Sequence, residues 1–161
     1  MKVVTGNVLD SNADVIIHQV NCQGVMGSGV AKQVKDRYPI VYEMYKAKCN
    51  EYKTFADMDS NPLLGFAQIC YKENYPVTDV KDKQAIVNLF SQNHYGHSGV
   101  YTDYDAMRKG LESINQQFAG STVAVPYLMG CCRGGGDWKI VAKIINESLK
   151  DCDVTAYHWA E

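Results

Sequence analysis

Two glycine-rich segments contain the residues whose types and spacing are best suited to bind a ligand. The first has glycines at positions 24, 27 and 29, and the second, residues 130–136, ends in three successive glycines. Glycine lets the main chain approach a ligand closely, and the first N–H groups of a helix have no partner within that helix. The G-x-x-G-x-G spacing of the first segment matches neither the dinucleotide-binding pattern nor a P-loop. Because helical spacing of apolar residues follows both segments, each is predicted to bind an anion through main-chain N–H groups.

Three histidines near these segments are candidates for acid–base chemistry. His18 lies in the apolar run before the first segment, and imidazole can act as a general acid or base near neutral pH. It can equally be a hydrogen-bonded core residue, because strand alternation puts His18 on the face opposite Asn21. His94 and His97 lie in a polar loop, where they could orient water, although loop histidines are usually solvated.

The second segment carries further polar groups. Arg133 could clamp a phosphate. Asp137 could act as a base, although a role as N-cap of the following helix already explains it. Cys131 and Cys132 precede Arg133 directly, which excludes the longer cysteine-to-arginine loop of cysteine phosphatases. We therefore expect main-chain contacts with the ligand in this segment.

Alternating strands and helices are predicted to position these groups. Apolar runs typical of strands and spacing typical of helices give an α/β fold with helices on both faces of a mainly parallel sheet. Ligands bind such sheets beyond the carboxyl ends of the strands, so both glycine-rich segments should flank a diphosphate at one edge. A purely structural turn gives no reason for three successive glycines. The predicted strands are residues 2–5, 15–20, 65–71, 85–90, 121–127 and 154–159. The predicted helices are residues 30–38, 41–53, 104–118 and a helix that carries residues 141–149. A capping box is predicted at residues 102–105 and an exposed turn at residues 73–83.

Composition and charge limit the function classes. The chain has 161 residues, with 16 basic and 18 acidic side chains and a formal net charge of −2. Because proteins that bind nucleic-acid backbones normally carry a basic surplus, we expect none of that binding here. A single domain over residues 1–161 is expected, as are a cytoplasmic location, no membrane association and a monomeric state. The six cysteines lack metal-ligand spacing, so we expect free thiols, no metal and no cofactor.

In order and spacing, four segments resemble the ligand-binding segments of the macrodomain family. They are Gly6–Leu9, Val15–Asn21, Gly24–Val30, and Val125–Pro126 with Gly130–Trp138. The resemblance covers essentially the whole chain. It implies a three-layer α/β/α fold with a mixed, mainly parallel central sheet that binds ADP-ribose or a derivative.

The resemblance also implies which part of ADP-ribose each segment contacts. The segment at Asn7 would lie by the adenine, Asn21 would contact the distal ribose, Gly27–Ala31 would wrap the diphosphate, and Gly130–Gly134 would close over a phosphate and the distal ribose. The residues expected to bind the ligand are Gly6, Asn7, Val8, Gln19, Val20, Asn21, Met26, Gly27, Ser28, Gly29, Val30, Ala31, Gly130, Cys131, Cys132, Arg133 and Gly134.

Within the family, the sequence resembles two branches. The pattern from His18 to Cys22 is similar to the ADP-ribose 1''-phosphate phosphatases, and it makes a phosphatase with His18 and Asn21 as catalytic residues our first functional hypothesis. The other branch removes ADP-ribose from proteins or DNA with a lysine and, in some members, an aspartate. Here Gln92 stands about where that lysine would be, and Gly134 about where the aspartate would be. The alternatives are a non-catalytic module that binds ADP-ribose or a related NAD-derived signal, and a hydrolase that removes ADP-ribose from protein or nucleic acid.

Overall fold

A six-stranded sheet forms the centre of the computed structural model, which describes residues 1–72 and 83–159. The strand order is β1-β6-β5-β2-β4-β3, and all neighbouring strands pair in parallel except β3 and β4. The predicted mixed, mainly parallel sheet is therefore confirmed. The strands are β1 (Lys2–Thr5), β2 (Val15–Asn21), β3 (Ala67–Tyr71), β4 (Ala85–Gln92), β5 (Thr122–Pro126) and β6 (Asp153–His158).

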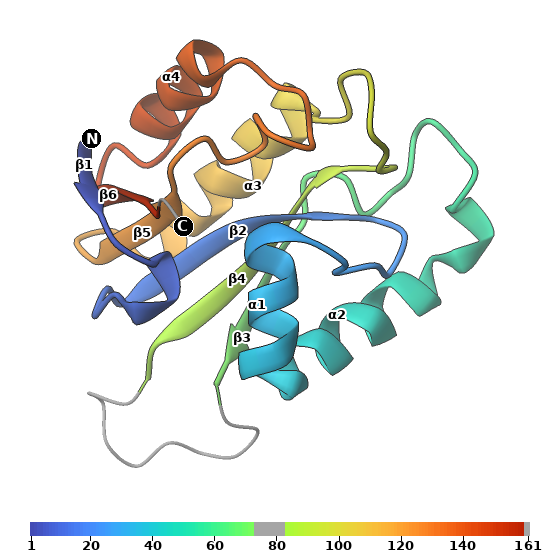
Figure 1. Ribbon diagram of the computed structural model, residues 1–161, viewed down its shortest axis with the longest axis horizontal. Coiled ribbons are helices and arrows are strands. Elements are labelled where there is room, and N and C mark those ends of the chain that lie inside the picture. Colours follow the sequence, from blue (N-terminus) through green and yellow to red (C-terminus); the bar gives the residue numbers. More distant parts are fainter. Residues whose placement is uncertain (73–82, 160–161) are drawn as a thin grey trace.

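Helices cover both faces of the sheet and complete a three-layer α/β/α arrangement (Figure 1). Two of them, α1 (Gly29–Arg37) and α2 (Pro39–Glu51), lie on one face, and α3 (Tyr104–Gln117) and α4 (Trp138–Ser148) lie on the other. Pro39 occupies the first turn of α2, a position that tolerates its missing N–H, and so separates α1 from α2 as predicted. Two short 3-10 helices, Val8–Asp10 and Lys53–Phe55, complete the described elements.

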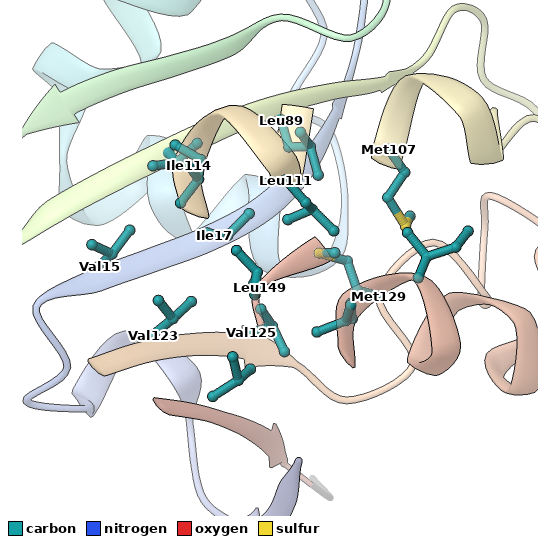
Figure 2. Close-up of a cluster of buried hydrophobic side chains, with 14 of the residues drawn as sticks. Val15, Ile17, Leu89, Met107, Leu111, Ile114, Val123, Val125, Met129 and Leu149 are labelled. Atoms are coloured by element: carbon teal, nitrogen blue, oxygen red, sulfur yellow. The ribbon is translucent and has the colours of Figure 1, made fainter. Parts of the chain in front are cut away.

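Apolar layers fill the space on both sides of the sheet. Figure 2 shows the layer between the strands and α3 and α4, where Met107, Leu111 and Ile114 of α3 face Ile17 of β2 and Leu89 of β4. On the other face, separate buried clusters pack against α1 and α2. All eight residues of β4 are buried, as expected for a strand covered on both faces.

One predicted local feature is wrong. The capping box was expected at Thr102 and Asp105, but α3 begins one residue later, with Asp103 as its N-cap and the Asp103 side chain accepting a hydrogen bond from the Ala106 N–H. An aspartate is as good an N-cap as a threonine, so neighbouring candidates compete. Thr102 is thereby free for contacts elsewhere. The turn predicted at residues 73–83 falls almost entirely outside the described residues.

Within the described ranges, no helix has the length and the apolar character needed to cross a membrane.

A glycine in the middle of α3 allows the helix to lie close against the sheet. A Cβ on Gly110 would overlap the side chain of Leu89 and lie 3.3 Å from the Gly65 carbonyl oxygen. We expect Gly110→Ala to lower the free energy of unfolding by about 1–2 kcal/mol, because overpacking outweighs the roughly 1 kcal/mol gain in helix propensity. Urea unfolding monitored by circular dichroism measures this change. Gln116→Ala, on the exposed side of α3, is the control and should not be destabilising. A Gly110→Ala protein more stable than the wild type would contradict the close packing.

Candidate functional site

A cavity of about 530 Å³ opens at the carboxyl ends of β2, β4 and β5. Both glycine-rich segments contribute to its wall, so the shared edge predicted from the sequence is present in the structure. The lining residues are His18, Gln19, Val20, Asn21, Val25, Gly27, Ser28, Gly29, Val30, Ala31, Gln92, Tyr95, Gly96, His97, Pro126, Tyr127, Leu128, Met129, Gly130, Cys132, Arg133 and Gly134. A second cavity of about 450 Å³ lies at the opposite edge of the sheet, around Met1 and Lys150.

The N-terminus of α1 presents unpaired N–H groups to the larger cavity. Ser28 is the N-cap of α1, yet its side chain makes no capping hydrogen bond within the described part of the chain. The first main-chain bond of the helix runs from the Lys32 N–H to the Ser28 carbonyl. The N–H groups of Gly29, Val30 and Ala31 therefore have no partner within the helix. These donors and the helix dipole together favour an anion at this wall.

The second glycine-rich segment connects β5 to α4 and packs against the chain that follows β4. Gly134 accepts main-chain hydrogen bonds at its carbonyl oxygen from the N–H groups of Tyr101 and Thr102, at 2.7 and 3.0 Å. A Cβ on Gly134 would overlap the Thr102 hydroxyl, and one on Gly135 would overlap the Gly99 carbonyl. The successive glycines thus have a structural reason in this close packing. The interpretation that only a ligand would require them is wrong.

Some residues expected to bind the ligand do not line the cavity. Asn7 is engaged within the protein, since its Oδ1 accepts from the Leu9 N–H at 3.0 Å and its Nδ2 donates to Gln33 Oε1 at 2.9 Å. Met26 is buried in the apolar cluster beside α2. Burial also raises the pKa of Cys131 to about 11, and its Sγ faces the Met129 carbonyl oxygen at 3.5 Å. The expected contacts that lie outside the lining are Gly6, Asn7, Val8, Met26 and Cys131.

His18 is buried in a chain of polar side chains that crosses three strands. Its Nε2 lies 2.6 Å from Asn88 Oδ1, Asn88 Nδ2 donates to Gln68 Oε1 at 3.0 Å, and Gln68 Nε2 donates to the carbonyl oxygen of Met44 in α2 at 3.0 Å. A carbonyl can only accept, so this oxygen orients both amides and makes Asn88 Oδ1 an acceptor. The hydrogen bond to Asn88 therefore places the proton of His18 on Nε2. Nδ1 is left unprotonated and has no partner among the described residues.

The charge state of His18 follows from the same burial. The side chain is 1% exposed, and desolvation lowers its pKa from 6.5 to about 4, although the hydrogen bond to Asn88 opposes this effect. His18 is therefore neutral at neutral pH. Because its only N–H is directed to Asn88, it is not available as a general acid.

Asn21 lies at the end of β2, where the pairing with β4 shifts in register. Its Oδ1 accepts from the Tyr45 hydroxyl at 2.7 Å and from the Gln23 N–H at 2.9 Å, and its Nδ2 donates to the Val25 carbonyl at 2.8 Å. Tyr45 belongs to α2, the helix that also ends the His18 chain. The expectation that His18 and Asn21 lie on opposite faces is wrong, because the Asn21 side chain turns toward α2 at the strand end. One Nδ2 hydrogen of Asn21 remains for a ligand.

Gln92, which the resemblance sets about where a lysine would be expected, is held by neighbouring groups. Its Oε1 accepts from Gln19 Nε2 at 2.9 Å, and its Nε2 donates to the His94 carbonyl oxygen at 2.9 Å. Among the cavity residues that the structure describes there is no aspartate, glutamate or lysine. Asp137 is the N-cap of α4 and accepts from the Lys139 N–H, as the sequence predicted.

The cavity also contains residues that the sequence analysis did not select. Val25 lies inside the predicted segment Gly24–Val30 but was not among the expected contacts. Leu128 and Met129 directly follow the predicted strand 121–127, and Tyr95 lies in the polar loop after β4. Leu128 has a φ of 62°, which is uncommon for a residue with a side chain and often accompanies functional sites. Their position just after a strand end was the available signal. His97 lines the cavity, whereas His94 does not.

Within residues 1–72 and 83–159, no three His, Cys, Asp or Glu side chains gather as a metal site would require.

The lowered pKa of His18 predicts how stability depends on pH. The unfolded chain binds a proton near pH 6.5 and the folded chain near pH 4, so protons favour unfolding between these values. We expect the His18 contribution to lower the free energy of unfolding by about 2 kcal/mol between pH 7 and pH 5. Urea unfolding at pH 7 and pH 5 measures this change in the wild type and in His18→Gln. The variant should lack this part of the pH dependence. His97→Gln, at an exposed position, should keep it. Equal pH dependence in all three proteins would refute the burial of a neutral His18.

No family model matches the chain, but known proteins resemble it in sequence. A DNA ADP-ribosyl glycohydrolase of Mycobacterium tuberculosis is 28% identical over 160 residues, which cover 95% of this chain and 40% of that protein. The chain thus spans less than half the length of this relative. An ADP-ribose 1''-phosphate phosphatase of Aspergillus oryzae is 37% identical over 54 residues, covering 33% of this chain and 27% of that protein.

Solved structures resemble the chain over almost its whole length. The macrodomain of Thermus aquaticus DarG superposes with a TM-score of 0.71 at 22% identity, covering 99% of this chain and 97% of that one. Thermosipho africanus DarTG in complex with ADP-ribose gives a TM-score of 0.73 at 23% identity, covering 97% of this chain and 40% of that one. The layers, the strand order and these likenesses agree: the chain has the fold of the macrodomain family.

Proposed function

We propose that this chain binds ADP-ribose, or a molecule that carries ADP-ribose, in the cavity at the carboxyl edge of its sheet. The observation that carries the proposal is the uncapped N-terminus of α1, whose free N–H groups face a cavity that residues 130–134 close from the other side. Anions bind to such helix ends through main-chain donors. Arg133 adds a positive charge to the opposite wall.

The lining changes in character along the cavity in the order that ADP-ribose requires. Beyond β5 it is apolar and aromatic, with Pro126, Tyr127, Leu128 and Met129, which suits a nucleobase. The diphosphate would lie at residues 27–31, across the end of β2. Beyond β4, Gln92 and His97 offer polar groups that suit a ribose. A volume of about 530 Å³ lies within the usual range for pockets that enclose a small ligand.

Hydrolysis at the distal ribose is the second candidate function. The activities of the relatives support it, since one is a DNA ADP-ribosyl glycohydrolase and another is an ADP-ribose 1''-phosphate phosphatase. His18 does not support it as a general acid, because it is neutral and its N–H is directed to Asn88. We propose His97, exposed at the cavity wall, as the side chain that would orient water.

Ser28 gives a sharp test of diphosphate binding. In Ser28→Asp, the carboxylate would cap the free N–H groups of α1 and repel the ligand, so we expect an affinity for ADP-ribose at least about tenfold weaker. The same carboxylate interacts favourably with the helix dipole, so the melting temperature of Ser28→Asp should not fall. Ser28→Ala is the matched comparison: it removes a hydroxyl that makes no capping hydrogen bond among the described residues but keeps the main-chain donors of α1, so we expect a smaller loss of affinity than in Ser28→Asp. Titration calorimetry measures the affinity of both variants for ADP-ribose and for adenosine. The proposal is wrong if the wild type binds no ADP-ribose, or if both variants bind it equally.

A turnover assay separates the binding module from the hydrolase. It measures phosphate release from ADP-ribose 1''-phosphate and ADP-ribose release from ADP-ribosylated DNA and protein. We expect rates no faster than in buffer, because the described lining has no carboxylate or lysine, and His18 has its N–H on Asn88 and a pKa of about 4, which makes it a weak base. Turnover of any of these substrates that His97→Ala abolishes would establish the hydrolase instead.

A further inference from the structure

We infer that Thr102, which does not line the cavity, is a positioning residue that holds residues 130–134 over the distal half of the ligand. This inference rests on the proposed function, because it concerns the affinity for ADP-ribose. Thr102 forms an isolated antiparallel bridge with Gln92 just before the N-cap of α3, and its side chain is 6% exposed. Its hydroxyl plays no part in capping α3, since Asp103 is the cap.

Three hydrogen bonds join Thr102 and its neighbour to both ends of the loop. The Thr102 hydroxyl donates to the Gly130 carbonyl oxygen at 2.7 Å. The N–H groups of Tyr101 and Thr102 donate to the Gly134 carbonyl oxygen at 2.7 and 3.0 Å. The hydroxyl therefore connects the first residue of the five-residue loop to the chain before α3, and main-chain hydrogen bonds connect the last residue to the same chain.

Gln19 determines the direction of the Thr102 hydroxyl. Its Oε1 accepts from the Ser91 hydroxyl at 2.6 Å, and its Nε2 donates both to Gln92 Oε1 at 2.9 Å and to Thr102 Oγ1 at 3.0 Å. Because Thr102 Oγ1 accepts from Gln19, its own hydrogen is free to bond to Gly130. A buried network in which each donor has an acceptor fixes one arrangement of its members. The ends of β2 and β4 are thus connected to the loop that follows β5.

Close packing ties the position of the loop to this hydroxyl. A Cβ on Gly130 would lie 2.9 Å from Gln19 Oε1 and 3.0 Å from Thr102 Oγ1, and one on Gly134 would overlap Thr102 Oγ1. Gly130 and Gly134 both line the cavity. Replacing the hydroxyl by a methyl group would leave one Gln19 N–H without its acceptor. Among the described residues, the Gly130 oxygen would keep only the hydrogen bond from the Gly136 N–H at 2.8 Å, which lies within the same segment. The first residue of the loop then loses its side-chain hydrogen bond to the chain before α3.

The test compares Thr102→Val, which keeps the shape of the side chain, with Thr102→Ser, which keeps the hydroxyl. Calorimetry measures the affinity of each protein for ADP-ribose and for ADP, which lacks the distal ribose. We expect Thr102→Val to bind ADP-ribose at least about tenfold more weakly. The loss for ADP should be smaller, because ADP keeps only the phosphate contacts of the loop, and Thr102→Ser should bind both ligands like the wild type. Unchanged affinity for ADP-ribose in Thr102→Val, or an equal loss for both ligands, would overturn the inference.

Hydrogen exchange tests the loop without any ligand. We expect faster amide exchange in residues 99–102 and 130–136 of Thr102→Val, with Thr102→Ser unchanged, and wild-type exchange rates in Thr102→Val would overturn the inference. A wild type that binds neither ligand would refute the proposed function. The exchange rates would still test the role of Thr102 in that case. If Thr102→Val does not fold, Thr102→Ala replaces it in both experiments.

Discussion

The parallel pairing of β2 with both β4 and β5 is the constraint on which the site depends. Parallel strands end at the same edge, so the chain leaves β2 toward α1, β4 toward the loop at Tyr95, and β5 toward the second glycine-rich segment from adjacent points. A strand-to-helix connection necessarily exposes the first N–H groups of its helix. The cavity and its anion-binding wall therefore follow from strand order, before any particular side chain is considered.

Hydrogen-bonded polar side chains in β2 and β4 then give this edge its shape. The apolar cores of β2 and β4 give way to His18, Gln19, Asn88 and Ser91, all buried or partly buried and all hydrogen bonded. Burying polar groups is costly unless they are paired, and pairing leaves little freedom in their positions. These side chains use their hydrogen bonds on one another and on the loops. The groups left for a ligand are mainly main-chain N–H groups and one amide hydrogen of Asn21, together with the exposed His97 and with Nδ1 of His18, which has no partner among the described residues and belongs to a ring whose pKa is lowered to about 4. This arrangement describes a rigid binding site better than a set of acid–base catalysts.

Hydrophobic periodicity was enough to predict the strands, the helices and the common edge, because those features depend on local patterns and on general rules of sheet topology. The details that it missed depend on contacts between distant residues. Thr102 was interpreted as a helix cap because its partners, Gln19 and Gly130, are far away in the sequence. The glycines at 134–136 were assigned to the ligand, whereas close contacts with Thr102, Gly99 and Gly130 require them. The face predicted for the Asn21 side chain was wrong because this side chain is hydrogen bonded to Tyr45 of α2.

The most direct test of the central claim is the change in backbone amide chemical shifts when ADP-ribose is added to the isotopically labelled protein. If main-chain donors at the carboxyl edge hold the diphosphate, the largest changes will occur at the amides of Gly29, Val30 and Ala31 and of residues 130–134. Changes that instead cluster around Met1 and Lys150, at the second cavity, with the α1 amides unmoved, would contradict this account.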